Sequence, residues 1–281
     1  MTRLAVRKTY KLFIGGAFPR SESGRSYAVT SPKGDFLANA SRASRKDARD
    51  AVSAARKAFS GWSGATAYNR GQILYRVAEV LEGRRGQFAE ELGGGKKAGQ
   101  EAVDAAIDRL VWYAGWSDKI AAVHSTANPV AGPYFNLSSP EPTGVVAVMA
   151  PADPLLGLVS VVAPVIVTGN TCVVVASERT PLPSITLAEV LATSDLPGGV
   201  VNILTGQQAE LAPWLAAHMD VNGLDLTGVT DPDLALRCEQ EAAANLKRVL
   251  RPAAEDWNAD PGLGRMTRFL ETKTVWHPLG A

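Results

Sequence analysis

The chain contains two cysteines, the residues best suited to act as nucleophiles, and neither lies where a reactive thiolate would form. Cys172 sits in an apolar run that we expect to be a buried strand, and Cys238 sits on an expected helix. Burial in apolar surroundings raises the pKa of a thiol and leaves it unreactive. The cysteines form no CxxC pair, and the three histidines are widely separated, at His124, His218 and His277. We therefore expect a reduced protein that holds no metal ion.

The composition favours a globular protein with a neutral surface. The 281 residues are 46% hydrophobic, enough for one large domain or two small ones. Because 29 Lys and Arg nearly cancel 28 Asp and Glu, no net field attracts nucleic acid or anionic lipid. The most apolar run, residues 154–168, contains two prolines and a glycine, and no long apolar stretch follows Met1 to Arg7. We expect no signal peptide and no membrane span, and hence a cytoplasmic protein.

The part of the chain that must position any site is a run of alternating strands and helices. Unbroken apolar stretches are typical of strands covered on both faces, and five of them separated by four helices indicate βαβ crossovers. The product we expect is an α/β fold with a doubly wound parallel sheet. We place the strands at 144–150, 171–175, 200–204, 223–226 and 246–250, and the helices at 155–167, 184–193, 208–219 and 234–245.

Other elements surround this expected sheet. Residues 11–18 and 27–31 look like the two strands of a small hairpin. Apolar residues recurring every three or four positions predict amphipathic helices from Ser44, from Ile73 and over 102–120. Strand-like alternation also occurs in two short stretches, at 135–137 and 268–277. Between Pro252 and Gly262 we find no residues that suggest chemistry.

Three short sequence motifs together resemble those of one protein family. They read Trp-Tyr-Ala-Gly-Trp-Ser-Asp-Lys at 112–119, Glu-Pro-Thr-Gly at 141–144 and Leu-Pro-Gly-Gly-Val-Val-Asn at 196–202. Together they resemble the aldehyde dehydrogenase superfamily. The match runs from about Lys11 to Pro252 and resumes from Gly264 to Leu279, so the chain looks like a truncated member that lacks the catalytic domain. Residues 6–11 and 18–23 resemble the silent second module of two-module members.

The resemblance implies catalytic groups that this chain does not have. The family's nucleophilic Cys phrase is absent. Pro252 stands where the family places its general base, and proline can neither take nor relay a proton. Asp153 stands where the family places an Asn that donates to the oxyanion, and a carboxylate there would repel the developing charge. We interpret Asp153 instead as the cap of the following helix. We expect no dehydrogenase activity from the chain by itself, as in a pseudoenzyme.

The family's ribose loop, Lys-Pro-Ser-Glu, is only partly kept. The lysine is replaced by Val175, which removes a charge-assisted donor, while Ser177 and Glu178 remain. The resemblance leaves Ser177, Glu178 and Gly206 as vestigial positions for NAD. A solvated loop carboxylate is the simpler interpretation of Glu178.

The family's phosphate turn, Phe-Thr-Gly-Ser-X-X-X-Gly, is altered as well. Thr227 and Gly228 are kept, but Asp233 replaces the second glycine and Asp231 lies beside it. Two carboxylates at a helix N-terminus satisfy its amide groups and compete with a phosphate. We expect no cofactor, with weak NAD binding left open.

The resemblance implies that the chain retains the family's oligomerisation arm. It implies two parts: a Rossmann-like domain with N-terminal helices, residues 1–124 and 144–253, and an antiparallel arm, residues 125–143 and 262–281. A free arm edge and an apolar surface left by the missing domain both call for a partner. We therefore predict a non-catalytic subunit in a hetero-oligomer with a full-length aldehyde dehydrogenase, or self-association through the arm. The alternatives are an NAD-dependent oxidoreductase component that retains weak NAD binding, and a domain recruited to another small ligand.

Overall fold

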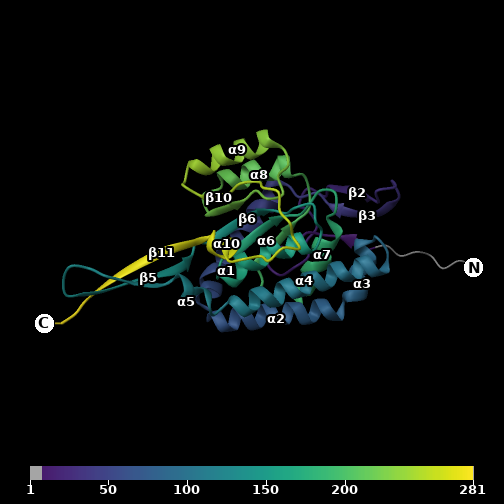
Figure 1. Cartoon of the computed structure of the whole chain (residues 1–281). Coiled ribbons are helices and arrows are strands. Elements are labelled where there is room, and N and C mark those ends of the chain that lie inside the picture. The colour runs from purple at the N-terminus through teal and green to yellow at the C-terminus, as the bar shows by residue number, and fades with distance from the viewer. Residues whose placement is uncertain (1–7, 281) are drawn as a thin grey trace, which may run out of the picture.

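The core of the protein is a five-stranded parallel sheet, as the alternating sequence pattern predicted. The computed structural model describes residues 8–280, and the expectations for Met1 to Arg7 lie outside them. Strand order is β10-β9-β6-β7-β8, so the chain winds from the central β6 first to one side and then to the other. The fold is therefore α/β and Rossmann-like, with the alternating elements visible in Figure 1. The strands are β6 (Val145–Met149), β7 (Thr171–Val175), β8 (Val201–Leu204), β9 (Gly223–Asp225) and β10 (Arg248–Leu250).

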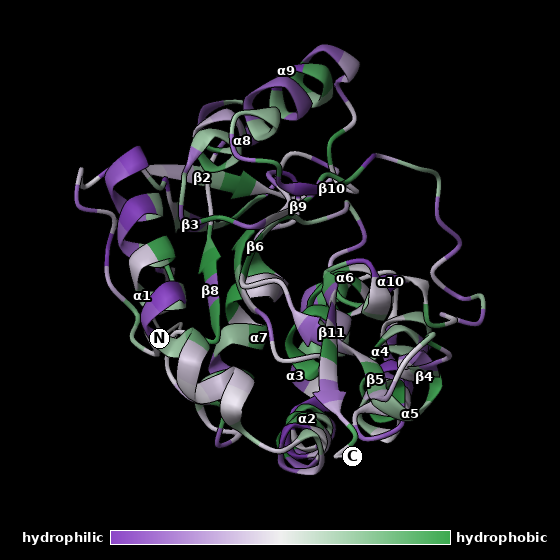
Figure 2. Ribbon diagram, turned by 90° about the vertical axis from the view of Figure 1, so that its left-hand side faces the viewer, coloured by the Kyte–Doolittle hydropathy of each residue, from purple (hydrophilic) through white to green (hydrophobic). Residues whose placement is uncertain are grey.

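Helices cover both faces of this sheet, which explains why its strands are apolar on both sides. Alternate strand residues pack into two separate apolar clusters, one on each face. One cluster includes α6 and α7, and all twelve residues of α6 are buried. The other includes α1, α8 and α9. Figure 2 shows the hydrophobic colour concentrated on the central strands and the hydrophilic colour on the outer helices. The bounds are α1 (Arg45–Gly64), α6 (Leu156–Val167), α7 (Leu182–Ala192), α8 (Gln208–Ala217) and α9 (Pro232–Ala243).

A second layer of helices packs outside α6. The long helix expected over 102–120 begins earlier, at Lys96, and ends at Trp116. A short helix ahead of it was not predicted, because its eight residues hold only two buried apolar side chains and show no clear period. Glycines 93–95, all with positive φ, make the turn between these two helices. The layer consists of α2 (Ala67–Gly83), α3 (Arg85–Leu92), α4 (Lys96–Trp116) and α5 (Ile120–His124).

The N-terminal hairpin forms with a different partner from the one predicted. Strand β2 (Ser26–Thr30) pairs with β3 (Phe36–Ser41), and β1 (Thr9–Tyr10) adds to the other edge of β3. Residues 11–18 instead make a tight turn that reaches the main sheet. There the N–H of Phe13 donates to the carbonyl of Ile203 at 2.9 Å, and the reverse bond is 2.7 Å. The sequence pattern missed β3, since its exposed Phe36 and Leu37 interrupt strand-like alternation.

An antiparallel arm projects from the body at the end opposite β2 and β3 (Figure 1). Its two long strands pair over nine residues, from Leu270 opposite Pro142 to Pro278 opposite Tyr134. Both strand-like stretches predicted here are confirmed. The first is longer than predicted, over 134–142, whereas the second is shifted to 270–278. The short helix α10 leads into the last strand. The arm consists of β4 (Thr126–Asn128), β5 (Tyr134–Pro142) and β11 (Leu270–Pro278), preceded by α10 (Gly264–Thr267). Over residues 8–280, no helix combines the length and apolarity needed to cross a membrane.

Candidate functional site

The position where a sheet of this type binds ligands lies between β6 and β9. In open α/β sheets the ligand crevice opens beyond the carboxyl ends of the strands, where the winding direction reverses. The strand order places that reversal at β6, with β7 on one side and β9 on the other. The sequence-derived positions Ser177, Glu178, Gly206, Thr227 and Gly228 all follow the carboxyl ends of β7, β8 or β9. The fold therefore brings them to one edge of the sheet.

A buried ion pair occupies the end of β9. Asp225 is 1% exposed, and Arg265 from α10 donates to its Oδ2 at 3.1 Å. The same guanidinium donates to Thr227 Oγ1 at 3.2 Å and to Glu255 at 2.8 Å. Burial raises the pKa of the Asp225 carboxyl, while the charge of Arg265 and the hydrogen bonds from Thr227 oppose that rise. Thr227, a candidate cofactor residue, is thus bonded within the protein.

Residues 251–263, which we call the covering segment, lie across this edge. The guanidinium of Arg265 stacks 5.2 Å from the ring centre of Trp257. Arg109, on α4, donates to the carbonyl oxygens of Trp257 at 2.7 Å and Ala259 at 3.0 Å, and to Ser160 Oγ at 2.9 Å. The first two bonds hold the covering segment against α4, and the third joins Arg109 to α6. A cavity of about 320 Å³ remains between the segment and these helices.

The covering segment is where sequence reasoning missed the most. The stretch from Pro252 to Gly262 was predicted to carry no chemistry, and its packing role was not foreseen: Trp257 lies 3.2 Å from where a Cβ on Gly157 would stand. No motif signals Arg265, Arg109 or Trp257. The one available signal was Asp225, an ionisable residue in an apolar strand, which needs a partner when buried.

The phosphate-turn residues are committed to packing and capping. Gly228 donates its N–H to the carbonyl of Met149 at 2.9 Å, and a Cβ on it would stand 2.0 Å from the carbonyl oxygen of Ala150. Only glycine permits this approach of the β9–α9 turn to β6. Asp231 is the N-cap of α9, and its carboxylate accepts the N–H of Asp233 at 3.0 Å. The predicted acidic cap of this helix is confirmed.

The ribose-loop residues are also engaged within the fold. Glu178 Oε1 accepts the N–H of Gln208, the first residue of α8, at 2.6 Å, so the carboxylate caps that helix. Glu178 is exposed in the loop after β7, as the sequence suggested, and the capping bond is an addition that the sequence did not predict. Gly206 has φ +143°, and a Cβ on it would stand 3.1 Å from the backbone nitrogen of Ala43. Ser177 is buried.

Asp153 and the two cysteines are also engaged within the fold. Asp153 Oδ1 accepts the N–H groups of Leu155 at 3.2 Å and Gly157 at 2.7 Å, so its predicted capping role at the start of α6 is confirmed. Burial raises the pKa of the Cys172 thiol, and it raises that of Cys238 to about 11. Neither thiol is activated. Within residues 8–280 we find no group of three or more His, Cys, Asp and Glu side chains placed to hold a metal ion.

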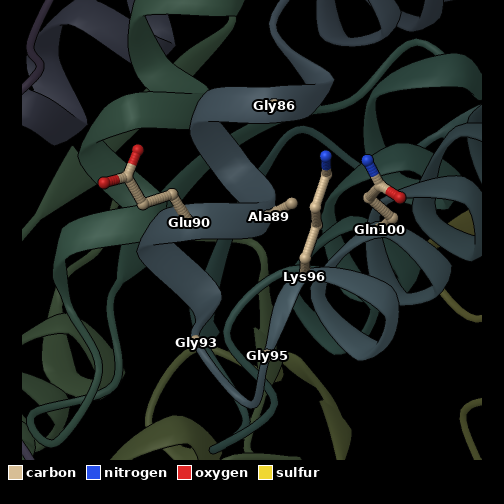
Figure 3. Close-up of a pocket in the computed structure, with 7 residues that line it drawn as sticks. All are labelled: Gly86, Ala89, Glu90, Gly93, Gly95, Lys96 and Gln100. Atoms are coloured by element: carbon tan, nitrogen blue, oxygen red, sulfur yellow. The ribbon is translucent and has the colours of Figure 1, made fainter.

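Other hollows lie away from this edge. The turn between α3 and α4 borders a cavity of about 430 Å³. Figure 3 shows that Lys96 and Gln100 project from α4 in the same direction, whereas Glu90 on α3 points away from them. These side chains do not converge on one point, so they form no catalytic arrangement. A separate cavity of about 410 Å³ lies beyond the end of β7.

Comparison with known proteins agrees with the fold. The profile described as Aldehyde dehydrogenase family matches residues 18–251. Retinal dehydrogenase 2 of Mus musculus is 36% identical over 254 residues, which are 86% of this chain and 48% of that protein. Aldehyde dehydrogenase, cytosolic 1, of Elephantulus edwardii is 33% identical over 259 residues, 89% of this chain and 51% of that protein.

Solved structures give the same result. An aldehyde dehydrogenase from Bacillus cereus, solved as an NAD+ complex, superposes with a TM-score of 0.79 at 26% identity, covering 86% of this chain and 50% of that one. HpcC from Thermus thermophilus gives a TM-score of 0.80 at 29% identity, covering 86% and 47%. The chain spans about half the length of the relatives it matches. On the strength of the profile match and these identities, it belongs to the aldehyde dehydrogenase family.

Proposed function

We propose that this chain is a non-catalytic member of its family that assembles with a full-length aldehyde dehydrogenase through its arm. The observation that carries the proposal is the contrast between a sheet edge filled by the chain's own residues and an arm left exposed. Arg265, Asp225 and Trp257 occupy the edge where a ligand would enter. The arm projects into solvent with its outer strand unpaired along one side (Figure 1).

The absence of reactive groups supports the non-catalytic part of the proposal. Oxidation of an aldehyde by this family's chemistry needs a thiolate and a base close together. Both thiols in residues 8–280 are buried with raised pKa values. Pro252, at the position of the family's general base, is exposed and cannot accept a proton.

The geometry of the arm supports the assembly part. Strand β11 has β5 as its one neighbour in the described residues, so its other edge presents unpaired backbone groups over nine residues. Such an edge readily adds a strand from another chain. The arm also exposes five large apolar side chains, each between 37% and 56% accessible: Tyr134, Phe135, Leu137, Trp276 and Leu279. Apolar groups gathered in this way typically become buried in an interface.

We further propose that NAD binds weakly or not at all. A pyrophosphate needs free amide groups at a helix N-terminus, and Asp231 already bonds one at α9. Glu178 in the ribose loop and Thr227 in the phosphate turn are already hydrogen-bonded within the chain. Titration calorimetry with NAD should therefore give a Kd of about 1 mM or weaker. Micromolar binding would favour the alternative, an oxidoreductase component that keeps its cofactor.

The decisive experiment mixes the purified chain with a full-length aldehyde dehydrogenase from the same cell and measures the native mass. We expect a complex of defined stoichiometry and no aldehyde-dependent NADH formation by the chain alone. A homo-oligomer that ignores the full-length enzyme would replace the proposed partner with a second copy of this chain. A monomer in both conditions, or NADH formation by the isolated chain, would refute the proposal.

A further inference from the structure

A cavity of about 620 Å³ lies at the base of the arm. Its walls come from the end of α1, the start of α2, α5, and the parts of β5 and β11 nearest the body. Figure 1 shows α5 beside β5 at this end of the body. The volume lies within the range of small-molecule sites. None of the five candidate cofactor positions lines this cavity, so it is separate from the crevice at the sheet edge.

Arg70, on α2, brings a positive charge to the cavity wall without an acidic partner. The side chain is half-buried, and it forms no salt bridge with any carboxylate of the described residues. Burial lowers the pKa of the Arg70 guanidinium, and no nearby carboxylate in that part of the chain opposes the shift. The carboxylate in the lining, Glu141, is paired instead with Lys273 at 2.9 Å. A guanidinium keeps its proton, so an anion that balances this charge must come from outside.

The contacts of Arg70 leave one of its nitrogens available to a ligand. Nε donates to the carbonyl oxygen of Val167 at 3.0 Å, and Nη1 donates to those of Ser63 at 3.4 Å and Ala65 at 2.5 Å. Nη2 makes no hydrogen bond within residues 8–280. It does not belong to the buried side-chain atoms without a partner, so solvent reaches it. Two N–H donors on an accessible, charged group therefore remain for a ligand.

The wall around this guanidinium is mostly apolar. A Cβ on Gly169, just after α6, would stand 3.5 Å from Cζ of Arg70 and 3.3 Å from Cγ of Pro142, so the charge lies beside β5 where the arm leaves the body. A ligand that suits this wall combines a negative group with hydrocarbon, because burial of apolar surface is favourable. The other apolar lining residues include Phe59, Ala67, Ile120, Ala121, Pro140 and Leu270.

We propose that this cavity binds a small carboxylate that carries a short alkyl chain. The carboxylate accepts a hydrogen bond from Nη2 of Arg70, and the alkyl chain packs against Ile120 and Leu270. A hydrogen bond between two charged groups is about twice as strong as one between neutral groups. Inorganic phosphate is disfavoured, because it brings no apolar surface to walls that are mostly apolar. The site depends neither on assembly through the arm nor on NAD.

Calorimetry with sodium hexanoate tests the proposal on the purified chain. We expect saturable binding with a Kd on the order of 1 mM or tighter. At matched ionic strength, hexan-1-ol should bind at least about tenfold more weakly because it lacks the charge, and acetate and inorganic phosphate because they lack the alkyl chain. Binding of any of these three probes as tight as that of hexanoate, or no saturable binding of hexanoate, would overturn the proposal.

Variants on α5 locate the site without disturbing the contacts of Arg70. Ala121→Glu places a negative charge in the cavity wall at an exposed position and should weaken hexanoate binding about tenfold. The matched control, Ala122→Glu, adds the same charge at the next exposed residue, which is not part of the lining, and should change the affinity at most about twofold. Unchanged affinity in Ala121→Glu, or an equal loss in both variants, would refute the site.

Arg70→Met tests the charge itself. The variant removes Nη2 and should weaken hexanoate binding about tenfold or more, while hexan-1-ol binding should change little. Because it also removes the bonds to three carbonyl groups, circular dichroism must first show that the variant folds. Unchanged hexanoate affinity in folded Arg70→Met would refute the proposal, and if the variant does not fold, the two α5 variants decide it.

Discussion

The carboxyl edge of the sheet and the arm differ in whether their groups have partners within the chain. At the sheet edge, polar groups are buried and bonded to one another, with Arg265 serving both Asp225 and Thr227. On the arm, backbone edges and apolar side chains such as Trp276, 56% exposed, meet solvent. Polar groups that already have hydrogen-bond partners within the chain offer little to a ligand, whereas unpaired backbone groups can bind another chain. This contrast is what the proposed assembly through the arm rests on.

The difference also revises an argument drawn from sequence. We expected the missing catalytic domain to leave an apolar surface on the nucleotide-binding part. Instead, all of α6 is buried, and the covering segment contacts its first turn through Trp257. The proposed assembly is therefore assigned to the arm and not to the sheet edge.

The largest expected effect comes from breaking the buried ion pair. Arg265→Met should leave Asp225 as an uncompensated buried charge and lower the free energy of unfolding by about 3–5 kcal/mol. Urea denaturation monitored by circular dichroism measures this change in the free energy of unfolding. The matched control is Arg248→Met, which loses a bidentate pair with the half-exposed Glu271 and should cost at most about 1 kcal/mol. Equal losses in both variants would show that the sheet edge does not depend on this pair.

The next effect concerns the arm. The double variant Phe135→Lys with Trp276→Lys should weaken assembly about a hundredfold, because buried aromatic residues dominate interface energies. Sedimentation of the mixture with full-length enzyme measures the affinity. Met219→Lys, at a site 70% exposed on the body, provides the control and should assemble normally. Should both variants assemble equally well, the interface must lie elsewhere.

A third prediction concerns Lys247, a buried cation that, unlike Arg265, has no acidic partner in the described residues. Lys247 is 9% exposed, makes no salt bridge in the described residues, and burial lowers its pKa to about 8. The folded state loses this proton near pH 8, whereas the unfolded chain keeps it to about 10.4. The unfolded state therefore binds more protons in that window, and the native state gains stability as pH rises through it.

Lys247→Met removes this dependence. The variant should be more stable than the parent at pH 7 by about 2 kcal/mol, and the difference should shrink towards zero by pH 10. Denaturation midpoints at both pH values measure it. Lys97→Met, an exposed lysine on α4, should show a pH-independent difference. A difference for Lys247→Met that does not change with pH would contradict the assigned burial.

The smallest effect concerns the caps that replaced the family's site residues. Asp231→Ala removes the cap of α9 and should cost about 1 kcal/mol of stability. Asp153→Ala should cost a similar amount, since its carboxylate accepts two amide groups of α6. If either variant gained NAD binding in calorimetry while losing this stability, the cap would be shown to compete with a phosphate.

The elements of the sheet followed closely from sequence because each is defined by local pattern. Strand β7 was predicted at its observed bounds, since Thr171–Val175 is apolar throughout and buried on both faces. Errors occurred where the pattern was short or partly exposed. The strand at 36–41 and the helix at 85–92 were missed for that reason, and the hairpin partner of β2 was wrong.

At the candidate site, contacts within a few residues were predictable from sequence and long-range contacts were not. Capping by Asp153 and Asp231 was predictable, because a cap acts within a few residues. The role of Glu178 in capping α8 was not, since its partner Gln208 lies 30 residues away.

The sequence by itself determined the family and the alternation of strands and helices, because these reside in local residue types and spacing. The tertiary structure alone decided that Arg265 pairs with Asp225, 40 residues away, and that Arg109 holds the covering segment across the sheet edge. Such pairings join segments that are distant in sequence, and their energy comes from burial that exists only once the chain has folded.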